Sequence, residues 1–203
     1  LGVASGAFGV PQAGKAPSIS GKDFIREENS KKGTWDWRLT KTKTIPGKIN
    51  KILDNGRSKA IEGYCNANSL RVGEKLRIMV SANPASAFKL DIFRTGYYGG
   101  TGARLMKTFD SIMAGTQPEP SIGENYVREC QWEPTVELEI PKTWPSGVYL
   151  GKMTAERSGI QSYVIFIVRD DRPCDFLFQC SDLTWSAYNR WPADYSIYTP
   201  HEK

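Results

Sequence analysis

Histidine is almost absent from this sequence, since His201 is the only one in 203 residues. The four cysteines, Cys65, Cys130, Cys174 and Cys180, show no C-x-x-C spacing. Zinc sites are usually built from closely spaced cysteine and histidine ligands. The sequence therefore excludes a zinc site of the usual composition. A metal bound here would need oxygen ligands such as carboxylate or phenolate, which suit a hard ion like ferric iron.

Long apolar runs are also missing. No stretch approaches the roughly 20 consecutive apolar residues that a transmembrane helix needs, so the sequence predicts no transmembrane segment within these residues. A nucleic-acid motif is missing as well. The net charge is +5, but the 27 basic residues are scattered among 22 acidic ones, and we expect no nucleic-acid partner.

The glycine-rich run 94–104 lacks a phosphate-binding motif. Gly100 and Gly102 have no third glycine at the required spacing, and no Lys-Ser or Lys-Thr pair follows. The run instead favours a tight loop with Tyr97 and Tyr98 packed across it. No hydroxyl or thiol is paired with His201 by a known spacing, so the sequence assigns no catalytic residue.

Alternation of apolar and polar residues dominates the middle of the chain. This period of two is typical of antiparallel strands that bury one face. The alternating or apolar segments are 75–80, 88–92, 136–140, 148–153 and 163–168. Short strands separated by turn residues predict a mainly β fold, with an immunoglobulin- or fibronectin-like β-sandwich over residues 59–170.

Residues 1–58 precede this domain and are polar, with little periodicity, so we expect an extended arm. Trp35 and Trp37 within it need a surface to cover them. Residues 1–16 resemble the end of a secretory signal, which favours export to the periplasm or the extracellular space. In such an oxidising compartment four cysteines would allow three pairings.

A charged segment with a proline, 169–173, marks a domain boundary after the sandwich. The following residues 174–180 are apolar at successive positions, as in strands buried on both faces of an α/β sheet. Residues 184–189 then open a helix or a loop at the end of that strand, where open α/β sheets bind ligands. We therefore expect 171–203 to begin an incomplete α/β domain, completed by residues outside this chain or by a second chain.

Six short segments in order carry a family resemblance. They are 36–40, 61–65, 93–100, 143–150, 168–171 and 184–191. Together they resemble the C-terminal region of the N,N-dimethylformamidase large (beta) subunit and its exported relatives. The resemblance extends from about residue 35 to 200 and is specific for the family, but not for a substrate.

The resemblance implies a β-sandwich that leads into an α/β domain with one iron, held by two tyrosines and a glutamate. It also implies hydrolysis of the amide bond of a small formamide. Tyr188, in a Trp-x-Ala-Tyr-Asn segment, corresponds to one iron ligand, and the other ligands are expected beyond Lys203. Asn189, Asp182 and Trp185 are the neighbours that could hold the phenolate in place.

Two functions follow from these observations. The first is part of an exported, iron-dependent amidohydrolase, whose partners are a small amide and the remainder of the α/β domain or a second chain. The alternative is a non-catalytic sandwich whose exposed rings bind a glycan or a protein partner. For Tyr188 itself, the alternative to an iron ligand is a ring packed beneath a loop with its hydroxyl bonded to backbone. The sequence does not determine the oligomeric state, and an oligomer is one of the states it allows.

Overall fold

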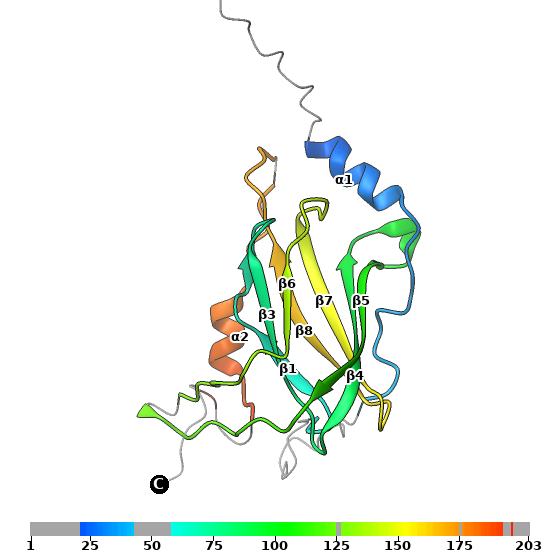
Figure 1. The fold of residues 1–203 in the computed structure, drawn as a ribbon. Helices are drawn as coiled ribbons and strands as arrows, with labels where there is room; N and C mark the ends of the chain where they lie inside the picture. The colour runs from blue at the N-terminus through cyan, green and yellow to red at the C-terminus, as the bar shows by residue number, and fades with distance from the viewer. Residues whose placement is uncertain (1–20, 43–57, 125–126, 175, 193–195, 197–203) are drawn as a thin grey trace, which may run out of the picture.

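The computed structural model describes residues 21–42, 58–124, 127–174, 176–192 and 196 (Figure 1). It is mainly β, with a three-stranded and a five-stranded sheet packed face to face. The small sheet has the order β1 (Glu62–Cys65), β3 (Lys75–Ser81), β6 (Val136–Glu139). The large sheet has the order β2 (Ser69–Leu70), β8 (Gln161–Val168), β7 (Gly147–Ala155), β4 (Ser86–Thr95), β5 (Ala103–Ala114).

Strand pairing is antiparallel throughout both sheets, except that β2 runs parallel to β8. The long strand β4 lies next to the edge strand β5 of the large sheet and pairs with β5 on one side and with the central strand β7 on the other. The register between β4 and β5 shifts twice, after Phe88 and after Ile92. These irregularities interrupt the alternation along β5, which explains why no strand is predicted there from the sequence.

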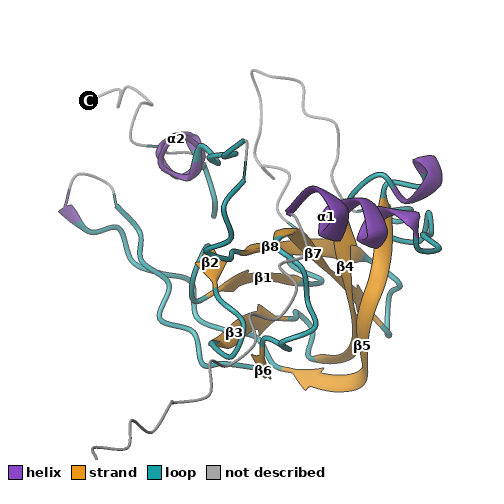
Figure 2. Cartoon of the chain, turned by 90° about the horizontal axis from the view of Figure 1, so that it is seen from above, coloured by secondary structure: helices purple, strands orange, loops and turns teal. Residues whose placement is uncertain are grey.

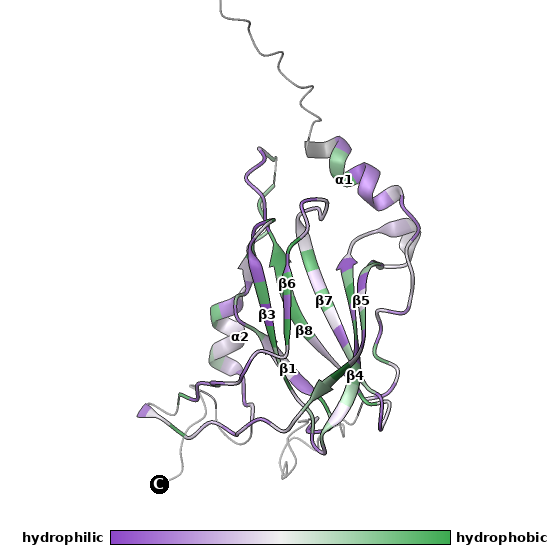
Figure 3. Cartoon of the chain, viewed as in Figure 1, coloured by the Kyte–Doolittle hydropathy of each residue, from purple (hydrophilic) through white to green (hydrophobic). Residues whose placement is uncertain are grey.

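The core lies between the two sheets (Figure 2). Leu76, Ile78 and Val80 of β3 and Phe88, Leu90 and Ile92 of β4 are fully buried, and these are the alternating residues of the sequence. Figure 3 shows apolar residues concentrated along the strands. Burying a side chain of this size contributes about 1.5–3 kcal/mol. The predicted β-sandwich is therefore confirmed, while its immunoglobulin or fibronectin type stays a prediction.

Three stacked rings form part of the core. Tyr149 lies between Trp144 and Phe166, with ring centroids 5.0 and 5.3 Å away. Its hydroxyl donates a hydrogen bond to the carbonyl of Pro145 at 2.6 Å. The buried phenol thus has an acceptor, as a polar group in a core requires.

The arm expected over residues 1–58 is not extended throughout. Gly21–Ser30 form helix α1, and residues 31–42, which we call the strap, cross the outer face of the large sheet. Trp37 donates its indole N–H to the carbonyl of Thr101 at 2.9 Å. The loop at Thr101 therefore covers Trp37, as predicted for both tryptophans, whereas Trp35 stays half exposed. The proposed boundaries 1–58, 59–170 and 171–203 stay predictions.

Lys152 fixes the middle of the strap. Its side chain leaves β7 on the face opposite the core and is only 8% exposed. Nζ donates to the carbonyls of Asp36 and Arg38 at 2.7 and 2.9 Å. Burial lowers the pKa of this ammonium group. The amide N–H of Thr40 donates to Gln161 Oε1 of β8 at 2.7 Å, which holds the end of the strap.

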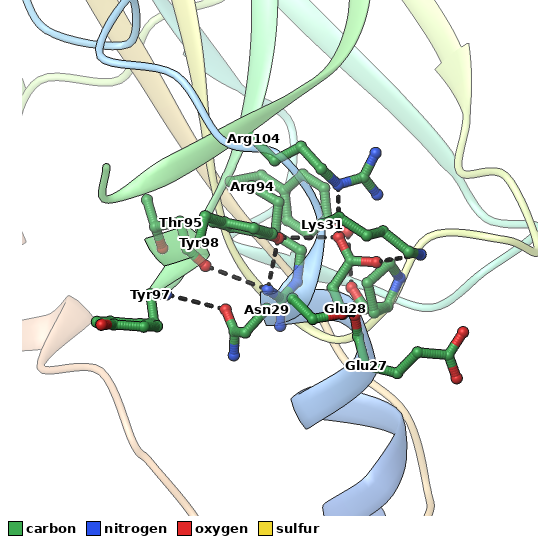
Figure 4. A network of polar contacts seen from close by, with 12 residues as sticks. Glu27, Glu28, Asn29, Lys31, Arg94, Thr95, Tyr97, Tyr98 and Arg104 are labelled. Atoms are coloured by element: carbon green, nitrogen blue, oxygen red, sulfur yellow. Dashed lines mark hydrogen bonds and ion pairs between the residues drawn. The ribbon is translucent and has the colours of Figure 1, made fainter. Parts of the chain in front are cut away.

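Glu28 attaches helix α1 to the glycine-rich loop between β4 and β5 (Figure 4). It is 3% exposed and accepts hydrogen bonds from Tyr98 at 2.9 Å, Arg104 at 2.7 Å and Lys31 at 2.7 Å. Arg94 in turn donates to the Tyr98 hydroxyl at 2.8 Å. Burial alone would raise the pKa of Glu28, but these donors outweigh it and leave the pKa below its ordinary value.

The loop itself confirms the prediction of a tight glycine-rich turn, with one tyrosine packed rather than two. Tyr98 is buried, whereas Tyr97 is 69% exposed. Gly96 is required because a Cβ there would collide with the Asn29 carboxamide, whose oxygen also accepts the N–H of Tyr97 at 2.9 Å. The 3₁₀ turn at Tyr98–Gly100 has positive φ at Gly99 and Gly100, which favours glycine.

We predict that Lys152→Met releases the strap. Two hydrogen bonds from a charged donor are lost, so the free energy of unfolding should fall by about 2 kcal/mol. Hydrogen exchange of residues 34–41 should rise more than that of β4. Lys142→Met, in the exposed turn after β6, is the matched control and should change neither quantity; an unaltered strap in Lys152→Met would contradict this assignment.

A second prediction concerns pH. The pKa of Glu28 is lower in the folded protein than its ordinary value of 4.5, so its stabilising effect is complete above that pH and disappears as the pH falls through the folded pKa. Glu28→Gln should therefore be about 2 kcal/mol less stable than wild type near neutral pH. The difference should shrink towards pH 3 in urea unfolding. Exposed Glu27→Gln should show no such pH-dependent difference; a constant gap for Glu28→Gln would refute the network.

Candidate functional site

The segment that follows β8 is fixed to the sandwich at its start. Asp171 forms an ion pair with Arg71, with Nη2 to Oδ1 at 3.1 Å, which lowers the pKa of the Asp171 carboxyl. Arg172 donates to the Ser146 hydroxyl at 3.1 Å and lies 4.2 Å over the ring of Phe24 in α1. The segment predicted as a boundary, 169–173, is therefore fixed to the sandwich and to α1 by side-chain contacts.

The strand expected at 174–180 is not formed, and this expectation is wrong for residues 174 and 176–180, which the structure describes. None of them pairs with a strand of either sheet. Phe176, Leu177 and Phe178 are 89%, 90% and 81% exposed. An extended segment that is apolar on both faces needs strands beside it and layers on both sides. The described part of the chain offers neither.

Helix α2 (Asp182–Tyr188) follows and occupies the place where a helix or loop is predicted. Tyr188 is its last residue and is 64% exposed, so its ring is not packed beneath a loop. Trp185 lies three residues earlier on the same helix face and is also exposed. The two rings therefore form a short exposed surface at the end of the helix.

The other predicted neighbours of Tyr188 lie elsewhere. Asp182 is in the first turn of α2, and its side chain points about 120° away from that of Tyr188 around the helix axis. The side-chain oxygen of Asn189 accepts the backbone N–H of Trp191 at 3.0 Å and so stabilises the turn after the helix. The structure brings Trp185 to the helix face of Tyr188, but gives Asn189 a local role.

A cluster that the sequence does not predict holds the chain just after α2. We call Glu62, Tyr64, Trp132 and Trp191 the anchor. Trp191 donates its indole N–H to Glu62 Oε2 at 2.8 Å, and its ring meets that of Trp132 edge to face at 5.7 Å. Tyr64 lies 5.5 Å from Trp132 and accepts its backbone N–H at 3.2 Å.

The anchor joins residues that are far apart in the sequence. Glu62 and Trp191 are separated by 129 positions, and no periodicity links them. The only signal is that both residues lie in family-like segments, Glu62 in 61–65 and Trp191 at the end of 184–191. Sequence reasoning could thus single out both residues, but not the contact between them.

Metal ligands are incomplete in the part of the chain that the structure describes. No group of three His, Cys, Asp or Glu residues there could hold a metal ion. Tyr188 is 64% exposed, and a phenol oxygen is a donor of the type that suits ferric iron. None of the four cysteines, all of which are described, forms a disulfide, and burial raises the pKa of Cys65 to about 12. Neither described helix is long and apolar enough to cross a membrane.

A family model described as N,N-dimethylformamidase beta subunit-like, C-terminal, matches residues 89–203, which is more than half of the chain. The chain belongs to this family. No curated protein matches it. The dimethylformamidase-like match includes most of the large sheet, strand β6 and helix α2, but begins after α1, the strap, β1 and β3. The resemblance found in the sequence is thus confirmed.

We predict that the exposed segment contributes little to folding of the sandwich. Phe176→Ser should change the free energy of unfolding by no more than about 0.5 kcal/mol, because its ring is 89% exposed. Phe88→Ala, in the core, should cost about 3–5 kcal/mol. Urea unfolding of both variants measures the contrast, and a similar loss in the two would mean that residue 176 is packed.

Proposed function

We propose that this chain is part of a dimethylformamidase-like, iron-dependent amidohydrolase that acts on the C–N bond of a small amide. Membership of a dimethylformamidase beta-subunit-like family supports a hydrolase-associated role. The observation that carries the finer proposal is the exposed phenol of Tyr188 at the end of α2, within the matched residues.

Tyr188 is the proposed iron ligand of this chain. A phenolate is a hard, anionic donor, and the exposure of the ring leaves room for a metal and further ligands. When bound, ferric iron supplies Lewis-acid activation of an amide carbonyl and of water. The described residues provide this one donor, so the proposal requires the remaining ligands to come from other residues or another chain.

The surrounding apolar residues fit the wall of a site that excludes water. Trp185 lies beside Tyr188, and Leu183 and Phe176 to Phe178 are exposed before it. Exposed apolar groups of this size favour a covering partner. We propose that the remainder of an α/β domain or a second chain covers these apolar residues. Oligomerisation is one way to supply the second chain. Export to the periplasm or beyond is part of the same proposal.

The alternative function is a non-catalytic module that binds a glycan or protein partner. The exposed rings of Trp185 and Tyr188 favour it, because aromatic rings supply large contact areas at binding surfaces. Metal content separates the two functions. The amidohydrolase needs iron for activity, whereas the binding module does not.

Tyr188→Phe tests the proposal directly in the complete protein. We expect loss of iron, loss of the visible phenolate-to-iron absorption band, and a fall in amidase activity of more than about 100-fold, since losing even an outer-shell partner costs 10–100-fold. Tyr97→Phe, at a similarly exposed tyrosine in the β4–β5 loop, is the control and should keep all three. Iron retained at full occupancy in Tyr188→Phe would remove this residue from the site.

A further inference from the structure

Helix α2 is short and buries none of its own side chains. It has seven residues, Asp182–Tyr188, and none of them is buried. Apolar burial is what normally holds an amphipathic helix in place, because short helices are marginally stable by themselves. Burial of its own side chains therefore does not fix the position of α2, and the contacts made before and after the helix gain importance.

The contact after the helix is the stronger candidate for setting the position of Tyr188. Trp191 follows Tyr188 by three residues, so their Cα atoms lie within about 10–11 Å of each other whatever the path of the chain. The contact before the helix, at Asp171 and Arg172, is some sixteen residues away. Its influence on Tyr188 is correspondingly weaker, because many rotatable bonds intervene.

The anchor also has the chemistry of a specific attachment. Glu62 is 9% exposed, and its carboxylate accepts the Trp191 indole N–H at 2.8 Å. The edge-to-face contact with Trp132, itself nearly buried, fixes the plane of the indole. A hydrogen bond with one ionised partner is stronger than a neutral one and is directional. The hydrogen bond and the ring contact together fix the position and the orientation of the Trp191 indole.

We propose that Trp191 is a positioning residue for Tyr188, and that the sandwich acts on the site through Glu62 of β1 and Trp132 of the segment before β6. The importance of Trp191 for catalysis rests on the proposed function, because the position of Tyr188 affects catalysis only if Tyr188 is an iron ligand. The sandwich is then a structural part of the site, which fixes where the phenol is presented to the covering partner.

Hydrogen exchange of the complete protein, followed by mass spectrometry, tests the attachment independently of iron. Trp191→Phe and Glu62→Ala should each raise exchange in residues 182–191 at least about tenfold, because a hydrogen bond to a charged group is lost. Glu62→Gln retains an acceptor at the same place but loses the charge, so its exchange should lie between that of wild type and that of Glu62→Ala. Trp35→Phe, an exposed tryptophan in the strap, is the matched control and should leave this peptide unchanged.

The exchange rates of these variants show whether the anchor holds α2 in place. Wild-type exchange in residues 182–191 of both Trp191→Phe and Glu62→Ala would overturn the attachment. If Trp191→Phe fails to fold, the comparison of Glu62→Ala with Glu62→Gln decides, and equal exchange in the two would count against it. Peptides of β3 and β4 should exchange as in wild type in every folded variant.

A spectroscopic arm separates this inference from the proposed function. In iron-loaded protein, Trp191→Phe should shift or weaken the visible absorption band although Tyr188 is present, and Trp35→Phe should not. An unchanged band together with faster exchange would overturn the positioning role. A wild-type protein that binds no iron would refute the proposed function, while the exchange experiment would still decide the attachment.

Discussion

The packing of the two sheets against each other is the constraint on which the rest of the structure depends. The alternating residues of β3 and β4 can leave water only if the small and large sheets face one another. The sum of these buried side chains is the main favourable contribution to folding. Each remaining part of the described chain is attached to the outside of this core.

Each of the outer attachments includes a buried polar group, and at the anchor ring contacts are added to it. Lys152 holds the strap, Glu28 holds α1, and Glu62 holds the residues after α2. In each case a charged side chain with little exposure meets donors or acceptors from a segment distant in sequence. Because such contacts are directional, they fix the place of a segment that could not fold alone.

The sequence was informative where its pattern is local. Alternation predicted the sandwich and most of its longer strands, since a strand with one buried face shows its period directly. Strand β5 was not predicted, because two register shifts interrupt the alternation of apolar and polar residues along it. The strap and the anchor escaped because a pairing such as that of Lys152 with the carbonyl of Asp36, 116 positions away, has no periodic signature. The apolar run 176–178 has the composition of a buried strand, but a strand forms only when neighbours are present.

Tyr188 links the family, the fold and the proposed chemistry. It ends an exposed helix within the matched residues, three positions before the tryptophan that joins the sandwich. The most direct test is anomalous diffraction at the iron absorption edge from crystals of the complete, active protein. The account predicts an iron peak in bonding contact with the phenol oxygen of Tyr188. An active amidase whose iron lies away from Tyr188 would contradict it.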